Sequence, residues 1–353
     1  MKLAIALCAT LAAALQAPLQ IHNHNDNPKL TVSKSLFTEL EELARIVDIA
    51  YCVGTPAPGI SKPFECPSRC GDFDSFELVT TWNTGILLSE SCGYIALSHA
   101  PAAKRVIVAF RGTYSITNTI ADLATIPQEY VPYPGAEGNK SGPTVPKCED
   151  CLVHMGFHSS WKNTKDVILP DVQISMEENP GYELVLVGHS LGGAIAALAG
   201  LDLVGRGYNP TVTTFGEPRL GNQAFADYVD ARFNLSRNGT NAADYEPSNF
   251  RRVTHVNDPI PLLPLEEWGY MPHGGEIFLN NSELPPELED AYHCAGSHDP
   301  SCSAGTASSA SHRWGIPTRF KIWQLFFAHR DYFWRLGLCV PEYWLWFDNK
   351  KVD

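Results

Sequence analysis

Short apolar runs alternate with stretches of helical periodicity along most of this 353-residue chain. Residues 105–110 and 183–187 are largely apolar runs, typical of strands that are buried on both faces. Residues 212–215 and 252–256 predict shorter and weaker strands. Helical periodicity covers residues 35–51, 159–178, 192–204 and 222–233. This alternation predicts the α/β class, with a mainly parallel central sheet and helices on both of its faces.

Residues 1–17 have the pattern of a secretory signal peptide. Lys2 gives a positive start, residues 3–15 are apolar, and small residues up to Ala17 offer cleavage points. The alternative is a membrane anchor, which needs about 20 apolar residues and so more than this run provides. No later stretch is long and apolar enough to cross a bilayer, so we expect a soluble protein that is secreted to the extracellular space.

The rest of the chain reads as one unit. Residues 18–34 look polar and extended, which predicts a short pro-segment or an N-terminal tail. No internal repeat follows, and the small Ser/Ala/Gly stretch at residues 303–311 is the one low-complexity tract. We therefore expect a single catalytic domain over residues 35–353, and we expect it to be a monomer.

Export would place the cysteines in an oxidising compartment, where most of them should pair. Cys8 leaves with the signal peptide, and nine cysteines remain: Cys52, Cys66, Cys70, Cys92, Cys148, Cys151, Cys294, Cys302 and Cys339. An odd number leaves one thiol outside any disulfide. We expect this to be Cys92, because residues 93–96 continue it into what looks like a buried strand.

Close spacings among the cysteines allow two interpretations. Cys66 and Cys70, Cys148 and Cys151, and Cys294 and Cys302 are near enough in the chain to close local loops. The spacing Cys-x-x-Cys at residues 148–151 also suits two zinc ligands. No second ligand pair at finger-like spacing accompanies it, and export argues against zinc, so we predict no zinc site.

Acidic residues outnumber basic ones, 39 Asp and Glu against 26 Lys and Arg, and the formal net charge is −13. Such a charge argues against nucleic acid as a partner and gives no attraction to acidic lipid, so any contact with a membrane or droplet would have to be apolar. Four Asn-x-Ser/Thr sequons predict glycosylated surface loops. Their asparagines are Asn139, Asn234, Asn238 and Asn280.

Residues 188–192 form the single Gly-x-Ser-x-Gly sequence of the chain. Alone the motif is weak, since it arises by chance in about one chain in ten of this length, and a plain tight turn is the alternative. An apolar strand leads into it, however, and a helix of small residues follows. This is the context of a nucleophile elbow, in which the turn exposes Ser190 at a helix N-terminus.

A serine hydroxyl is a poor nucleophile, so a base and an orienting acid must accompany it. In this type of fold the chain order is serine, acid, histidine. Asp258 follows the strand at residues 252–256, although Asp-Pro is also a common plain turn. Sequence order leaves six histidines open as the base: His255, His273, His293, His298, His312 and His329.

Residues 188–193 (GHSLGG) resemble the fungal class 3 lipases, the group of the Rhizomucor, Thermomyces and secreted Yarrowia enzymes. Five more segments resemble that family's motifs in the same order. They are residues 110–113 (FRGT), 153–161 (VHMGFHSSW), 215–222 (FGEPRLGN), 255–264 (HVNDPIPLLP) and 329–333 (HRDYF). Six ordered motifs are far more specific than one, and the resemblance implies an α/β-hydrolase fold with a short lid helix.

The resemblance also implies roles for particular residues. Ser190 would be the nucleophile, His329 the base that takes its proton, and Asp258 the acid that orients the ring. The backbone N–H groups of Thr113 and Leu191 would form the oxyanion hole. Without the resemblance, His329 would not stand out from the other histidines.

Residues 114–123 resemble the family's lid. Ile116, Ile120 and Leu123 fall on one apolar helical face, which would cover the site in a closed enzyme and bind lipid when open. Many relatives have Trp where this chain has Thr119, which weakens the expectation of strong interfacial binding. On periodicity alone, such a stripe is more often part of a core.

The cysteines also match the family. The resemblance implies one long-range disulfide and three local ones. They are Cys52–Cys339, Cys66–Cys70, Cys148–Cys151 and Cys294–Cys302. The acidic residues show no calcium loop, so we expect neither a metal nor another cofactor.

The leading hypothesis is a secreted triacylglycerol lipase that acts transiently at an oil–water interface. A feruloyl-type esterase or a phospholipase of the same fold is the alternative within the same chemistry. A non-catalytic lipid-binding relative is a third hypothesis from a different class, and it predicts a broken triad. All three implied members, Ser190, Asp258 and His329, are present.

The lid hypothesis can be tested by replacing Ile116 and Ile120 with Ser. Because the apolar face would be the part that contacts oil, the double variant should adsorb less to lipid droplets while it hydrolyses soluble esters at an unchanged rate. Droplet partitioning and soluble-ester turnover are the two measurements. Equal loss of both would contradict a lid role.

Overall fold

The computed structural model describes residues 29–54, 57–85, 91–113, 127–133, 145–235, 245–308 and 327–340. Several predicted features lie outside these residues. They are the signal peptide, most of the pro-segment, the lid with Ile116, Ile120 and Leu123, and the sequons at Asn139 and Asn238. The sequon residues Asn234 and Asn280 are described, and both are exposed.

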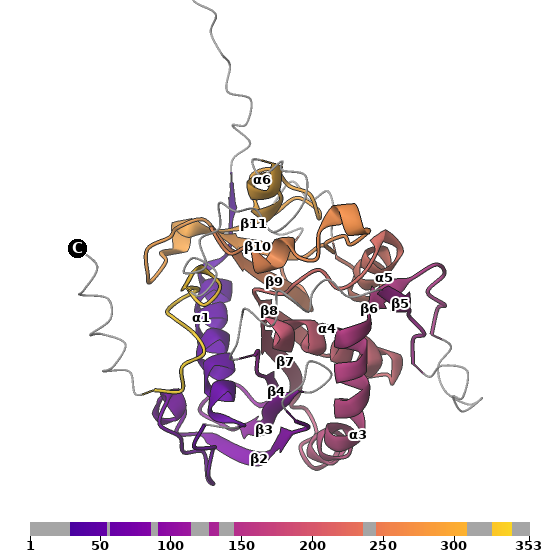
Figure 1. Cartoon of the computed structure of the whole chain (residues 1–353). Coiled ribbons are helices and arrows are strands. Elements are labelled where there is room, and N and C mark those ends of the chain that lie inside the picture. The colour runs from indigo at the N-terminus through magenta and orange to yellow at the C-terminus, as the bar shows by residue number, and fades with distance from the viewer. Residues whose placement is uncertain are drawn as a thin grey trace, which may run out of the picture.

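A nine-stranded sheet forms the centre of the described structure (Figure 1). Its spatial order is β1-β11-β10-β9-β8-β7-β4-β3-β2. The bounds are β1 (Leu30–Thr31), β2 (Phe76–Asn83), β3 (Cys92–Ser98), β4 (Arg105–Phe110), β7 (Glu183–His189), β8 (Thr211–Phe215), β9 (Phe250–His255), β10 (Glu276–Leu279) and β11 (Ala291–His293). A separate two-stranded sheet pairs β5 (Pro127–Glu129) with β6 (Leu152–His154).

The centre of the large sheet is parallel and its edges are antiparallel. Strands β4, β7, β8, β9 and β10 run parallel to one another. The pairs β2–β3, β3–β4, β10–β11 and β11–β1 at the two sides are antiparallel. The burial patterns differ accordingly. All six residues of β4 are buried, while buried and more exposed residues alternate along much of β2, as expected of an edge that faces water on one side.

Five α-helices occur among the described residues: α1 (Lys34–Ile49), α3 (Met155–Glu178), α4 (Leu191–Gly205), α5 (Gln223–Phe233) and α6 (Ser303–Ser308). Short 3₁₀ helices join them: η1 (Ala50–Cys52), η2 (Arg69–Asp72), η4 (Ile260–Leu262), η5 (Glu266–Trp268) and η6 (Leu288–Asp290). Helix α3 begins four residues before the predicted start at 159. Its N-cap is His154, whose Nδ1 accepts the Phe157 N–H at 3.4 Å.

Alternate residues of β4 belong to two hydrophobic cores, one on each face of the sheet. Val106, Val108 and Phe110 pack with residues of α3, α4 and α5, whereas Ile107 and Ala109 pack with residues of α1. Because successive strand residues point to opposite faces, α1 covers one face of the sheet and the other three helices cover the opposite face. This confirms the predicted arrangement of helices on both faces.

Four disulfides are present: Cys52–Cys339, Cys66–Cys70, Cys148–Cys151 and Cys294–Cys302. These are the four pairs that the family resemblance implies. Cys92 is a buried thiol outside these disulfides and hydrogen-bonds Asn83 Oδ1 at 3.1 Å. No helix among the described residues has the length and apolarity needed to cross a membrane.

The two kinds of disulfide should differ in their effect on stability. Cys52 and Cys339 are 287 positions apart, so removing both with Ala should lower the free energy of unfolding by about 5 kcal/mol through the loop that the unfolded chain regains. The matched control removes Cys66 and Cys70, only 4 positions apart, and should cost about 2 kcal/mol. Denaturant unfolding measures both losses, and equal losses would contradict the prediction.

Candidate active site

Ser190 lies in a sharp turn between β7, which ends at His189, and α4, which begins at Leu191. Its φ of 58° and ψ of −128° are strained for a residue with a side chain. The flanking glycines make the turn possible. A Cβ on Gly188 would lie 2.1 Å from the Gly192 carbonyl oxygen, and one on Gly192 would lie 2.3 Å from the Phe110 carbonyl oxygen. The local geometry is that of a nucleophile elbow.

The end of β4 packs directly against this turn. A Cβ on Gly112 would lie 2.9 Å from the Ser190 Cβ, so the segment that leads to Thr113 lies beside the serine. Leu191 is the first residue of α4, where a backbone N–H has no acceptor within its own helix. The two residues expected to form an oxyanion hole therefore belong to segments that adjoin Ser190.

His329 and Asp258 are in direct contact. His329 Nδ1 lies 3.0 Å from each carboxylate oxygen of Asp258, and both side chains are almost fully buried. Because an ionised carboxylate only accepts hydrogen bonds, Nδ1 carries the proton and Nε2 keeps its lone pair. Nε2 is buried and has no hydrogen-bond partner in the described parts of the chain. This leaves it as an acceptor for an incoming hydroxyl proton.

Two further groups hold the Asp258 carboxylate. The Tyr332 hydroxyl donates to Oδ2 at 2.6 Å, and the Ile260 backbone N–H donates to Oδ1 at 2.9 Å. Burial, and then the charge of Asp258, raise the pKa of Tyr332 well above its ordinary value, so the phenol remains a donor. The carboxylate is thus fixed by the end of β9, by η4 and by the segment that carries His329.

His189 connects the serine turn to His329. Its Nε2 donates to the His329 carbonyl oxygen at 2.8 Å, and its Nδ1 therefore accepts the Tyr51 hydroxyl proton at 2.5 Å. Burial, and then the nearby His329, hold the pKa of His189 well below its ordinary value, so this ring remains neutral. His189 lies within the Gly-x-Ser-x-Gly motif, but the sequence did not indicate its contact with Tyr51. The position of Tyr51, next to the bonded Cys52, is the one clue that could have found it.

The remaining described histidines have other partners. His255 Nε2 donates to the Asn281 carbonyl, His273 pairs with Glu217, His293 pairs with Glu246, and His298 lies 3.7 Å from Glu266. His312 lies outside the described residues. Of the six candidates, the structure thus places His329 against Asp258.

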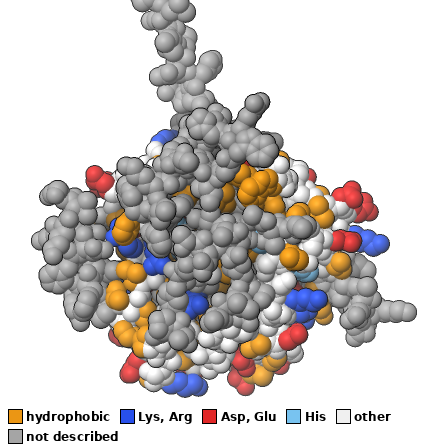
Figure 2. Space-filling view, viewed as in Figure 1, with side chains coloured by type: hydrophobic (Ala, Val, Ile, Leu, Met, Phe, Trp, Pro, Cys, Tyr) orange, Lys and Arg blue, Asp and Glu red, His pale blue; other side chains and the backbone are white. Residues whose placement is uncertain are grey.

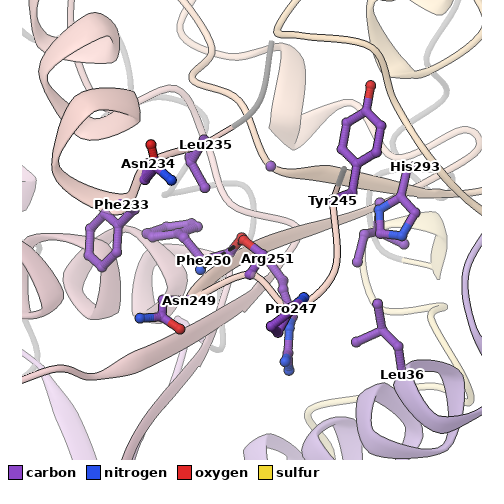
Figure 3. Close-up of a pocket in the computed structure, with 13 residues that line it drawn as sticks. Leu36, Phe233, Asn234, Leu235, Tyr245, Pro247, Asn249, Phe250, Arg251 and His293 are labelled. Carbon is purple, nitrogen blue, oxygen red and sulfur yellow. Dashed lines mark hydrogen bonds between the residues drawn. The ribbon is translucent and has the colours of Figure 1, made fainter. Parts of the chain in front are cut away.

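A cavity of about 200 Å³ lies beside the start of β9 (Figure 3). Phe250 and Arg251 at the start of β9 line it, together with Tyr245, His293 and the sequon residue Asn234. Asp258 lies beyond the other end of β9. Within the described ranges, no group of three or more His, Cys, Asp or Glu side chains could hold a metal ion.

Comparisons with known proteins match both the sequence and the fold. A family model described as lipase (class 3) matches residues 107–268. The secreted mono- and diacylglycerol lipase 2 of Gibberella zeae is 48% identical over 95% of this chain and 91% of its own length. Lipase A of Sodiomyces alcalophilus is also 48% identical, over 94% of this chain and 88% of its own length. The crystal structure of the Lip2 lipase from Yarrowia lipolytica matches with a TM-score of 0.74 at 30% identity, covering 88% of this chain and 98% of that one.

Replacing Tyr332 with Phe should destabilise the protein because it removes one donor from a buried carboxylate. We expect the free energy of unfolding to fall by about 1.5–3 kcal/mol, the contribution of a hydrogen bond to a charged group, and ester turnover to fall with it. Tyr292→Phe is the matched control, because that hydroxyl donates to the neutral Ser301 carbonyl. It should cost about 1 kcal/mol and leave turnover unchanged, and equal effects of the two variants on turnover would contradict the role of Tyr332.

Proposed function

The chain belongs to the fungal class 3 lipase family, and from this premise we propose that Ser190, His329 and Asp258 hydrolyse the ester bonds of acylglycerols. The enzyme is a secreted acylglycerol lipase of the α/β-hydrolase fold. The observation that carries the catalytic proposal is the contact of His329 Nδ1 with both oxygens of buried Asp258, which leaves Nε2 free to take a proton.

In the proposed reaction, the Ser190 hydroxyl attacks the carbonyl carbon of the ester as His329 Nε2 takes its proton. The tetrahedral intermediate collapses when the same proton passes to the departing glycerol oxygen, and an acyl-enzyme remains. Water then attacks the acyl group by the same route and releases a fatty acid and free Ser190. Asp258 holds the ring and stabilises its positive charge in each half of the cycle.

The negative charge of the intermediate requires hydrogen-bond donors that are already in place. We propose the backbone N–H groups of Leu191 and Thr113, because the segments that bear them both adjoin Ser190. The N-terminus of α4 adds a partial positive charge at the same point. One such donor typically contributes about 2.7–4 kcal/mol to stabilisation of the transition state.

The family leaves the preferred acylglycerol open. The name of the Gibberella zeae relative favours mono- and diacylglycerols over the triacylglycerols that the sequence led us to expect. We therefore propose partial glycerides as the preferred substrates. Feruloyl esters and phospholipids remain the alternative esters, and they are included in the experiment below.

Apolar side chains should mediate contact with oil. Trp268, downstream of Asp258, and Phe327, two positions before His329, are 47% and 41% exposed. On the face shown in Figure 2, hydrophobic side chains lie among acidic and basic ones rather than in a region of one charge. Together with the expected lid around Ile116 and Ile120, this supports transient binding to an oil–water interface. That the enzyme acts as a monomer stays a proposal from the sequence.

We propose that residues 1–17 are a signal peptide and that one catalytic domain runs to residue 353. The pro-segment or tail expected over residues 18–34 is proposed to end earlier, because Leu30–Thr31 pair with β11 as β1 and α1 begins at Lys34, so these residues belong to the catalytic domain. Asn234 and Asn280 are exposed, which supports their proposed glycosylation. Glycosylation of Asn139 and Asn238 is proposed from their sequons alone.

The test uses the secreted enzyme with emulsified mono-, di- and trioleoylglycerol, a phospholipid emulsion, methyl ferulate and a soluble p-nitrophenyl ester. We expect the highest kcat/KM on the partial glycerides and a kcat for Ser190→Ala that is lower by about 10⁴-fold or more. A matched control is Ser68→Ala, a serine outside the proposed triad. Full turnover by Ser190→Ala would refute the nucleophile, while a preference for methyl ferulate or phospholipid would refute the substrate class.

A further inference from the structure

Asp48 is a buried carboxyl group that the proposed reaction does not use. It lies in the last turn of α1 and is 3% exposed. Burial raises the pKa of this group above its ordinary value, although its hydrogen bonds and two nearby arginines, Arg69 and Arg330, act in the opposite direction. Since a buried carboxylate destabilises a fold unless its neighbours compensate it, the identity of those neighbours is informative.

The two oxygens of Asp48 contact two different segments. Oδ1 accepts the backbone N–H of Gly337 at 2.6 Å. Oδ2 accepts the Ser68 hydroxyl at 3.0 Å and lies 3.8 Å from Arg69 Nε. Oδ2 therefore contacts the start of η2, and Oδ1 contacts the segment that follows His329.

Gly337 closes a loop that starts at His329. The Leu336 N–H donates to the Arg330 carbonyl at 2.8 Å, and Arg330 Nη1 donates to the Gly337 carbonyl at 3.2 Å. An ion pair of 2.9 Å between Asp331 and Arg335 spans the same loop. We call residues 329–337 the histidine loop. These bonds join Gly337 to Arg330, the residue next to His329, so we expect a displacement of Gly337 to displace His329 as well.

Helix α1 and η1 hold the histidine loop at neighbouring points. Cys52 is bonded to Cys339, and Tyr51 reaches the His329 carbonyl through His189. Figure 1 shows this C-terminal segment, in yellow, beside α1. Asp48 adds a charge-assisted bond, which is shorter and stronger than a bond between neutral groups.

We propose that Asp48 is a positioning residue for the base: through Gly337 it fixes the histidine loop and so aims His329 at Ser190. Asp48 touches neither the substrate nor the reacting atoms. This inference rests on the proposed role of His329. The proposal adds to the site a residue of α1, which precedes Gly337 by 289 positions in the chain.

The test compares Asp48→Ala, Asp48→Asn, Asp48→Glu and Ser68→Ala. For each purified variant we would measure kcat and KM on a soluble p-nitrophenyl ester, and the rate at which a phosphonate inactivates Ser190. Asp48→Ala should lower kcat and the inactivation rate by about 10- to 100-fold with little change in KM, the effect expected from a small misplacement of a reacting group.

The other variants separate positioning from simple stability. Asp48→Asn keeps an acceptor for the Gly337 N–H and should restore most of kcat. Asp48→Glu keeps the charge but lengthens the side chain, so it should lower kcat even if Asp48→Ala does not fold. Ser68→Ala removes the bond to the other oxygen and should leave kcat unchanged.

Several results would overturn the proposal. One is a folded Asp48→Ala or Asp48→Glu variant whose kcat stays within twofold of the parent enzyme. Another is a variant with a lower Tm whose phosphonate-titrated enzyme keeps its full kcat. A third is a loss of kcat in Ser68→Ala that equals the loss in Asp48→Ala. Failure of the proposed function would look different. In that case Ser190→Ala or His329→Ala would retain turnover, whatever the Asp48 variants do.

Discussion

Asp258 is 3% exposed, and its carboxylate accepts hydrogen bonds from His329, Tyr332 and Ile260. A charge removed from water is stable only while such partners surround it, and loss of one partner leaves the rest of the charge uncompensated. The strand end, the 3₁₀ turn and the histidine loop must therefore reach the carboxylate together. This mutual dependence keeps the imidazole in one orientation and one tautomer, and the proposed chemistry requires both.

The parallel centre of the sheet brings the site to one edge. Strands β7 and β9 run in the same direction, so Ser190 after β7 and Asp258 after β9 emerge at the same end of the sheet. His329 comes from no strand of this sheet and depends on contacts with α1, η1 and the serine turn. The fold thus supplies two members of the proposed triad through sheet geometry and the third through tertiary contacts.

The sequence predicted the parts whose pattern is local. Strand β4 and helix α4 were visible because a run of six buried residues and a helix of small residues have simple signatures, and Ser190 followed from the turn between β7 and α4. The antiparallel edges were not predicted, since short strands such as β11 and β1 carry little periodicity. The early start of α3 depends on a cap by His154, which no composition rule indicates.

The identification of the proposed catalytic base shows most clearly what local sequence patterns fail to predict. Six histidines follow the serine, and nothing in the residues around His329 distinguishes it from the others; only the family resemblance did so. The structure places it against Asp258, 71 positions away. Tyr51 and Asp48 were missed for a related reason. In an amphipathic helix and its extension, Tyr51 looks like an ordinary interior residue and Asp48 like a solvent-exposed one, and their contacts lie 138 and 289 positions distant.

The Cys52–Cys339 bond and the contacts of the histidine loop with α1 join the earliest described helix to the last described segment. A ribosome-bound chain that has emerged through Asp258 already holds the elbow and the acid, yet it has no base. On the proposed mechanism, such a chain lacks esterase activity until the segment with His329 has been synthesised. Activity then also requires that this segment meets α1, because the contacts that hold the histidine loop come from that helix and from η1.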